Sequence, residues 1–539
     1  GDNGLWVYNT HTNSWDDAPI QTGKNAPIVR AVAQDRAGNL WFGLDNDGII
    51  VIDRAGNMER ITMNPGNMER ITMNPADPDG LGNNSITTII ADDDGNVWIG
   101  TQKKGVSAYN ESEFKFGLVP LDDVNCAAPG EGNTCWIGTD SDGLKLLDRT
   151  TGKITSYPDA ADGAKPAPIT ALTPSADGGI WIGTYNGGLK KFKNGAFTHY
   201  GKNKGIASEN VWAILENPDG TVWVGTLGKG LQLMNPATGD IKSFTLGDSG
   251  LDTDYIISLC HGDNNKTYIG TTVGLFVYDP ATGAITRFNN TRRDGENYYV
   301  SQVLYDSRGL LWIANDRELN VYDPEKGTTV QVPLSRHSSV TYVLGLMEDN
   351  AGKIWVAIDG AVAAVHVAKN PDGDGYIFRN HIYTASDGLQ NAVYNQRSLA
   401  KMRNGDIVIG GPYGLSYVSP ANIRYNMISP DILFTNLYLG NTEIKPGQKY
   451  DGHVIMEKSI NHADKITLRY NQNNFTIGFA ANNYVQPAST SYYYKLDGID
   501  QDWIECLKGV HHATFTNLSP GTYTLHVKAV NNDGVESSL

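Results

Sequence analysis

The sequence of 539 residues has few cysteines, no long apolar run and no excess of basic residues. No stretch approaches about 18 consecutive apolar residues, so no membrane-spanning helix is predicted. The segment Gly1 to Thr10 lacks both the charged and the apolar region of a secretory signal peptide. The formal net charge is −16, from 43 Lys and Arg against 59 Asp and Glu. Nucleic-acid binding through phosphate contacts is therefore disfavoured.

Sequence motifs of common enzymes are also missing. The chain has no G-x-S-x-G, H-E-x-x-H or C-x-x-C motif and no phosphate-cradling Gly-rich loop. We therefore predict no catalytic residue, no metal site and no cofactor. Of the four cysteines, Cys126 and Cys135 fall in one expected loop, where a disulfide and two free thiols are both open. Cys260 is expected to be a small core residue.

The chain does contain an internal repeat. Each unit has an alternating strand, the pattern Asp-x-x-Gly-x-apolar-Trp-apolar-Gly-Thr, a short loop ending in Gly and a further strand. The anchor residues of nine copies are Trp41, Trp98, Trp136, Trp181, Trp223, Tyr268, Trp312, Trp355 and Val408. Most are spaced by about 40 to 45 residues, which is the period of a β-propeller blade.

The repeat predicts an all-β fold in which four-stranded blades pack around an axis, with the Trp side chains filling the wedges between blades. Counting seven blades back from Val408 reaches Trp136, so residues 119–428 are expected to form a seven-bladed propeller. Residues 1–118 would then be the C-terminal blades of a preceding, incomplete propeller. The blade of Trp136 lacks an apolar first strand, which leaves a single larger propeller as an alternative.

Two further segments depart from the repeat. Residues 56–65 and 66–75 have identical sequences, which is either a genuine loop duplication or an artefact. After Pro420 the repeat stops, and residues 429–539 are expected to form an immunoglobulin-like β-sandwich without an obvious final strand. Its expected strands span residues 432–439, 465–481, 491–499 and 521–534.

The C-terminal segment contains SYYYKLDGIDQDWIE at residues 491–505 and ATFTNLSPGTYTLHVKAVNNDG at residues 513–534. These motifs resemble the triple-tyrosine (Y_Y_Y) domain, and the repeats resemble the two-component-regulator propeller repeat. Residues 388–420 also resemble the blade that precedes the Y_Y_Y domain. The combination covers almost the whole chain and is similar to the periplasmic sensor region of hybrid two-component systems from glycan-foraging gut bacteria.

This resemblance implies a function and a location. The chain would be the periplasmic part of an inner-membrane hybrid histidine kinase, joined to the membrane only through flanking helices outside this sequence. It would bind an oligosaccharide from polysaccharide breakdown, signal as a homodimer through the C-terminal sandwich and induce glycan-utilisation genes. The alternatives are a propeller glycoside hydrolase or polysaccharide lyase, and a structural interaction scaffold.

Comparison between blades separates packing residues from candidate ligand residues. Twelve residues before most anchors stands a β-branched residue such as Val211 or Ile256, which is expected to face the core. The position before it varies and is expected at the mouth of the central channel, on the same face as the loop after Trp-x-Gly-Thr. The predicted ligand-binding residues on this face are Trp212, Tyr255, Tyr299, Tyr342, Tyr185, Asn186, Lys229, Arg317, Tyr394 and Arg397.

The chemistry of these residues suits a sugar. Sugars offer apolar C–H faces and many hydroxyls, so their sites combine aromatic platforms with forked polar groups. Trp212, Tyr255, Tyr299 and Tyr342 come from four successive blades and are expected to form such a platform. The alternative is that they line a filled channel. The negative net charge favours a neutral oligosaccharide over a sulfated or uronate-rich one, unless a local basic patch overrides it.

Overall fold

The computed structural model describes residues 6–17, 28–52, 58–61, 81–159, 166–290, 296–334, 342–371 and 373–538. The duplication at residues 56–75 lies outside the described residues, apart from a strand at Met58–Ile61. The chain divides into two compact units, one of Phe114–Ile423 and one of Gly1–Glu113 with Arg424–Leu539.

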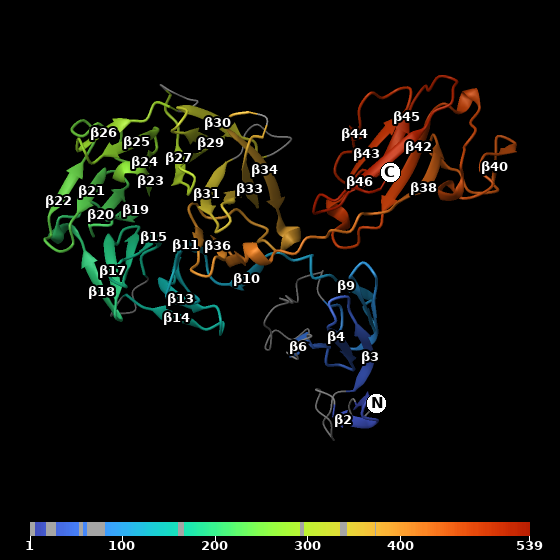
Figure 1. Ribbon diagram of the computed structural model, residues 1–539, viewed down its shortest axis with the longest axis horizontal. Coiled ribbons are helices and arrows are strands. Elements are labelled where there is room, and N and C mark those ends of the chain that lie inside the picture. Colours follow the sequence, from blue (N-terminus) through green and yellow to red (C-terminus); the bar gives the residue numbers. More distant parts are fainter. Residues whose placement is uncertain are drawn as a thin grey trace. The chain divides into compact units, whose positions relative to one another are not determined.

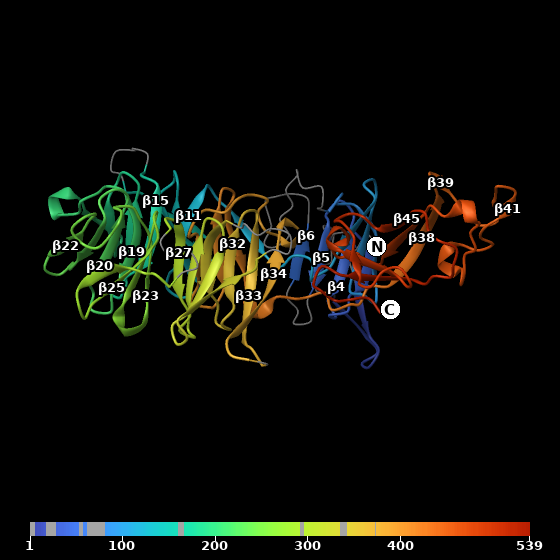
Figure 2. The ribbon, with the colours of Figure 1, turned by 90° about the horizontal axis from the view of Figure 1, so that it is seen from above.

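The unit of residues 114–423 contains seven four-stranded antiparallel sheets, which follow one another around a ring (Figure 1). Figure 2 shows the same sheets from the side. The first three sheets are β11 (Val124–Pro129), β12 (Thr134–Thr139), β13 (Leu144–Asp148) and β14 (Ile154–Tyr157); β15 (Ile169–Pro174), β16 (Ile180–Thr184), β17 (Leu189–Lys193) and β18 (Ala196–Tyr200); and β19 (Val211–Glu216), β20 (Val222–Thr226), β21 (Leu231–Met234) and β22 (Ile241–Phe244). The next three are β23 (Ile256–His261), β24 (Thr267–Thr271), β25 (Leu275–Asp279) and β26 (Ala284–Arg287); β27 (Val300–Tyr305), β28 (Leu311–Asn315), β29 (Leu319–Asp323) and β30 (Thr328–Val332); and β31 (Val343–Glu348), β32 (Ile354–Ile358), β33 (Ala361–Lys369) and β34 (Tyr376–Tyr383).

The seventh sheet joins the two ends of this unit. It consists of β35 (Leu399–Lys401), β36 (Ile407–Gly411), β37 (Gly414–Val418) and, from the start of the unit, β10 (Gly117–Pro120). The inner strands contact one another in the order β11, β15, β19, β23, β27, β31, β35 and back to β11. The ring is therefore closed, which confirms the seven-bladed propeller over the single larger one. The sheets span residues 117–418, compared with the predicted 119–428.

The blade of Trp136 is more regular than its sequence indicates. Its first strand, β11, reads VNCAAP, so small Cys and Ala side chains replace the expected larger apolar ones. Cys126 and Ala128 are buried, as the Val and Ile residues of the other inner strands are. The preceding segment, which seems irregular in sequence, is β10 and belongs to the last blade.

The anchor side chains fill the wedges between blades, as predicted. Trp181, Trp223, Trp312 and Trp355 are at most 1% exposed, and each packs against inner and second strands of the following blade. Val408 of the last blade packs with Val124 of the first, which closes the hydrophobic ring. Burying a tryptophan in this way stabilises the fold by several kcal/mol, of the order of about 3–5 kcal/mol.

The Asp of the Asp-x-x-Gly turn has a second role that the sequence does not announce. Its carboxylate accepts a hydrogen bond from the indole Nε1 of the anchor Trp six residues later. The pairs, at 2.8–2.9 Å, are Asp35–Trp41, Asp92–Trp98, Asp306–Trp312 and Asp349–Trp355. The same carboxylates accept backbone N–H groups of the turn, so one side chain fixes both the hairpin and the wedge.

The other unit contains the remaining strands. N-terminal to the propeller are β1 (Trp6–Asn9) and β2 (Ser14–Asp17); β3 (Val29–Gln34), β4 (Leu40–Leu44), β5 (Ile49–Ile52) and β6 (Met58–Ile61); and the three-stranded sheet β7 (Ile86–Ala91), β8 (Val97–Thr101) and β9 (Val106–Tyr109). Trp41 packs against Ile86 and Ile99 of the next sheet, which is the same wedge packing as in the closed propeller. Two of these sheets therefore pack like neighbouring propeller blades, and their assignment to a preceding propeller stays a prediction.

The C-terminal residues form two sheets. One contains β39 (Thr442–Glu443), β38 (Ile432–Leu439), β42 (Phe475–Ala481) and β45 (His512–Phe515), and the other β44 (Ile504–Glu505), β43 (Ser491–Leu496) and β46 (Leu525–Val530), beside a hairpin of β40 (Lys449–Tyr450) and β41 (His453–Val454). Phe479 of one sheet and Leu496 of the other share a core, which confirms the sandwich. The prediction of a strand over residues 465–481 was wrong for its first ten residues, because a 3-10 turn at Tyr470–Gln472 interrupts it.

Single-turn 3-10 helices complete the described secondary structure. They are Lys202–Lys204, Asp263–Asn265, Ala385–Asp387, Pro420–Asn422, Ile460–His462, Tyr470–Gln472 and Pro487–Ser489. No helix in the described part of the chain is long and apolar enough to cross a membrane.

The structure resolves the open question of the cysteines. Cys126 and Cys135 are both free and buried, and they belong to separate hydrophobic clusters on opposite faces of one sheet. They lie on the paired strands β11 and β12, with Cys126 opposite Gly138 and Cys135 opposite Pro129. The disulfide alternative is therefore not realised.

Thiol reactivity tests this arrangement. Burial raises the pKa of Cys126, Cys135 and Cys260 to about 12, so almost no thiolate is present at pH 8. We expect these three residues to react with a thiol reagent only after denaturation, as followed by mass spectrometry without reductant. A Cys126–Cys135 bridge in the denatured protein would contradict the structure.

Candidate functional site

The inner strands of the propeller share a bulge that projects one residue out of the strand pairing. In each of six blades the register skips the residue after the buried β-branched one. The skipped residues are Asn125, Thr170, Trp212, Ile257, Ser301 and Leu344. In the last blade Arg397 holds the equivalent position, two residues before the Leu399–Ile409 pair.

Arg397 reaches across the central channel. Its Nη1 donates to the carbonyl oxygens of Trp212, at 2.5 Å, and Ile257, at 2.7 Å. These carbonyls belong to β19 and β23, whereas the blade of Arg397 neighbours β31 and β11. The guanidinium therefore spans the ring, and its carbon lies 5.1 Å from the centre of the Trp212 ring. Burial lowers the pKa of Arg397 to about 10, which still leaves it charged at neutral pH.

A hydrogen-bonded chain joins two of the predicted tyrosines. The Tyr299 hydroxyl donates to Oε1 of Gln396 at 2.9 Å, and Nε2 of Gln396 donates to the Tyr342 hydroxyl at 2.6 Å. Burial raises the pKa of Tyr299, and the nearby Arg397 opposes this rise. Tyr342 remains 36% exposed. The side chains of Tyr299, Tyr342, Gln396 and Arg397, which come from three blades, are thus brought together at one sector of the rim.

The remaining predicted residues lie on the rim without a contact to this group among the described interactions. Tyr255 is 50% exposed and pairs through its backbone with Leu227 of the neighbouring loop. Tyr185 and Asn186 are exposed, and the Asn186 N–H donates to Oδ1 of Asn210. Lys229 and Arg317 are also exposed. Their places agree with the expected face of the propeller, and a ligand role for them stays a prediction.

Tyr394 does not belong to the rim. It is 2% exposed and packs in the core of the last blade with Trp355 and Leu399. Its hydroxyl accepts the backbone N–H of Gln390 at 3.2 Å. In the comparison between blades, Tyr394 stands one residue before the variable position of its blade. In the structure the side chain of Tyr394 points into the core of the blade and not toward the rim.

Sequence reasoning missed Gln396. This residue occupies the column that is Val or Ile in the other six blades of the propeller, where the side chain is buried. The departure from Val or Ile at this position was the signal in the sequence, because an amide at an otherwise aliphatic, buried position requires hydrogen-bond partners. Those partners are the two tyrosines.

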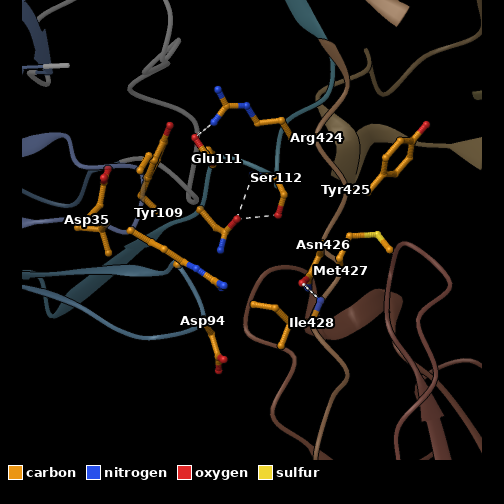
Figure 3. Close-up of a pocket in the computed structure, with 15 residues that line it drawn as sticks. Asp35, Asp94, Tyr109, Glu111, Ser112, Arg424, Tyr425, Asn426, Met427 and Ile428 are labelled. Atoms are coloured by element: carbon orange, nitrogen blue, oxygen red, sulfur yellow. Dashed lines mark hydrogen bonds and ion pairs between the residues drawn. The ribbon is translucent and has the colours of Figure 1, made fainter. Parts of the chain in front are cut away.

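A hollow lies in the other unit (Figure 3). Its volume is about 350 Å³, and it is lined by the turns at Asp35 and Asp94, residues 109–112 and the segment Arg424–Ile428. Several of its polar groups already have partners within the protein. The Asp35 carboxylate accepts from Trp41, and Arg424 pairs with Glu111. This hollow is best described as a junction between the N-terminal sheets and the segment leading into the sandwich.

The comparisons with known proteins agree with this architecture. The family model described as two component regulator propeller matches residues 80–103 and 205–228, and the model described as Y_Y_Y domain matches residues 483–538. A curated protein named histidine kinase P4, from Formosa agariphila, is 30% identical over 154 residues, which are 29% of this chain and 11% of that protein. The chain thus spans only a small part of this relative.

One solved structure shows the same fold. The crystal structure described as the extracellular domain of a hybrid two-component system from B. thetaiotaomicron superposes with a TM-score of 0.76 at 20% identity, covering 99% of this chain and 69% of that chain. An extracellular domain of a one-component system from the same bacterium gives a TM-score of 0.48 at 20% identity, covering 99% and 71%. The matched propeller repeats and C-terminal domain confirm the predicted resemblance: this chain has the Y_Y_Y and two-component-regulator propeller content of hybrid two-component sensor regions.

Proposed function

We propose that this chain is the periplasmic ligand-sensing region of a hybrid histidine kinase and that it binds an oligosaccharide at the rim of the seven-bladed propeller. The observation that carries the proposal is the group of Trp212, Tyr299, Tyr342, Gln396 and Arg397. It combines aromatic faces with an amide and a guanidinium, and hydrogen bonds hold the amide, the guanidinium and both tyrosine hydroxyls. Such a group matches the alternating apolar faces and hydroxyls of a sugar.

The site is preorganised, which favours binding over catalysis. Gln396 fixes both tyrosine hydroxyls, and the backbone carbonyls of two blades fix Arg397. Groups held in this way lose little freedom when a ligand binds. A glycoside hydrolase would instead place two carboxyl groups on either side of the scissile bond. The proposed site contains one amide and one guanidinium at its centre, so we infer recognition without turnover.

Signalling would require ligand binding to favour one arrangement of a receptor pair over another. We propose that the pair is a homodimer through the sandwich and that its output is the induction of glycan-utilisation genes. The tyrosines of the SYYY motif are partly buried in the sandwich, so they offer less contact surface than the sequence indicates. Ile499 and Leu507, on the loops after β43, and Ile504 of β44 are exposed and are the better candidates for the dimer contact.

Alanine substitutions at the rim test the binding site. Replacing Tyr255, Tyr299 or Tyr342 by Ala is expected to weaken oligosaccharide binding by about 1–3 kcal/mol while leaving the fold intact, because each removes an aromatic face from a partly exposed position. Isothermal titration calorimetry with an oligosaccharide identified from a panel measures the effect. Tyr470→Ala, an 86% exposed tyrosine of the sandwich, is the matched control and should bind as the parent does. Unchanged affinity in all three rim variants would refute the rim as the binding site.

A further inference from the structure

The charge on Arg397 has no acidic partner among the described residues. Arginine side chains that lie inside a protein are usually paired with carboxylates, because an unpaired buried charge is costly. Here the described partners are two backbone carbonyl oxygens, both on Nη1. The positive charge is therefore solvated by peptide dipoles and is not neutralised.

Two hydrogen-bond donors beside this charge are also unused. Nε of Arg397 and Nε1 of Trp212 are both buried and have no hydrogen-bond partner among the residues that the structure describes. The two side chains lie against each other, with the guanidinium carbon 5.1 Å from the ring centre. Buried donors without acceptors are rare in folded proteins, and each costs free energy until an acceptor arrives. Two such donors on adjoining side chains point to a shared missing acceptor.

The backbone of Arg397 adopts a conformation that is unfavourable for most residues other than glycine. Its φ is +58°, in the left-handed region. Every other described non-glycine residue with positive φ is Asn or Asp, the types that tolerate this region best. The conformation aims the side chain across the channel toward Trp212. Strained backbone of this kind is concentrated at binding and catalytic sites.

We propose that Arg397 and Trp212 form a subsite for a carboxylate, so that the ligand is an oligosaccharide containing a uronic acid unit. This inference rests on the proposed function and narrows its ligand class. A carboxylate supplies two acceptor oxygens and one negative charge, which satisfy the unused donors and the unpaired guanidinium together. A neutral hydroxyl would satisfy a donor but leave the charge unpaired.

The strongly acidic composition of the chain does not oppose this subsite. Charges separated by more than a Debye length, about 8–10 Å at physiological salt, are largely screened, so a local cation outweighs a global charge of −16. The rim acid Asp316 lies beside Arg317, at 4.0 Å, and adds to the effect of burial, which raises the pKa of Tyr342. It forms no ion pair with Arg397.

The experiment compares acidic oligosaccharides with their carboxyl-reduced forms. The probes are oligogalacturonate, glucuronoxylan and alginate fragments, each paired with the neutral sugar of identical length and linkage, together with a sulfated neutral oligosaccharide. Calorimetry with the unmodified chain is expected to show one acidic probe bound at least about ten-fold more tightly than its reduced partner, the range for a charged hydrogen bond.

Three variants locate the effect. Arg397→Met should bring the acidic and reduced forms within about three-fold of each other, since the charge and its donors are gone. Trp212→Phe keeps a smaller aromatic face and removes Nε1–H, so it should weaken binding of the acidic form about three-fold more than binding of the reduced form. Arg379→Met, which removes an exposed cation from the outer strand β34, is the control and should preserve the preference. If Arg397→Met does not fold, the affinities of the Trp212→Phe variant for the acidic and the reduced probes test the carboxylate subsite.

The outcomes separate this inference from the proposed function. Equal affinity for an acidic probe and its reduced partner would overturn the carboxylate subsite while leaving oligosaccharide sensing intact. Binding of the sulfated probe alone would also overturn it. Binding of no probe and of no neutral oligosaccharide would overturn both.

Discussion

Trp223→Ala is expected to lower the free energy of unfolding of the propeller by about 3–5 kcal/mol, the largest single-residue effect that we predict. The side chain is 1% exposed and fills the wedge between two blades. Its ring centre lies 5.6 Å from Phe244 and 4.9 Å from Tyr278. Removing it opens a cavity that rigid sheets on either side cannot close. Denaturant unfolding followed by fluorescence measures the change.

Ligand affinity provides the control for this variant. Trp223 lies in a wedge and has no described contact with the rim group, so the folded fraction of the variant should bind oligosaccharide with the parent affinity. Trp223→Phe retains part of the volume and should cost less than the Ala variant. A loss of stability below about 1 kcal/mol for Trp223→Ala would contradict the wedge role.

Asp306→Ala is expected to destabilise the propeller by about 2–4 kcal/mol, which is the second largest effect. The carboxylate is fully buried and accepts hydrogen bonds from Trp312 Nε1 and from the backbone N–H groups of Arg308 and Leu310. Its removal leaves these three donors without an acceptor and takes away the nearer of the two carboxylates that pair with Arg308. Thermal or denaturant unfolding measures the loss.

The matched control lies in another blade. Asp219 is an exposed residue of the equivalent hairpin turn and accepts only from Thr221. Asp219→Ala should therefore change stability by less than about 1 kcal/mol. Similar losses for the Asp306 and Asp219 variants would show that the carboxylates act only in the turns and that the link to the Trp wedge contributes nothing.

The blade architecture could be predicted because the repeat carries its own internal comparison. A wedge needs a large apolar side chain in every blade, so the anchor column from Trp41 to Val408 revealed both the packing rule and the number of blades. The same comparison separated buried residues such as Val211 from the variable rim position. The residues that recur in every blade serve packing, so their role can be recognised from a single sequence.

The closure of the ring of blades was harder to predict from the sequence. The strand β10 at residues 117–120 pairs with β37, about 300 residues later, and its four residues carry no pattern of their own. The clamp between Asp306 and Trp312 was also missed, because Asp-x-x-Gly is already explained as turn chemistry. Both features depend on where chain segments meet in space.

The sequence predicted the region of the candidate site but not the contacts between its residues. The variable column included Tyr299 and Tyr342, which the structure brings together through Gln396, and their ligand role stays a prediction. The bulge that turns Trp212 and Arg397 into the channel has no sequence signal, since it depends on how two strands pair. Gln396 and Tyr394 show the two kinds of error: an exception in a buried column was overlooked, and a core aromatic residue was assigned to the rim.

The central claim is that the propeller rim binds an oligosaccharide without altering it. The direct test is calorimetry of this chain with a panel of neutral and acidic oligosaccharides, combined with chromatography of each mixture after prolonged incubation. We predict binding to one class of oligosaccharide, weakened in the Tyr299→Ala and Tyr342→Ala variants, and complete recovery of the unmodified sugar. Shortened or unsaturated products would show a hydrolase or lyase, and the absence of binding to any member would contradict the sensor account.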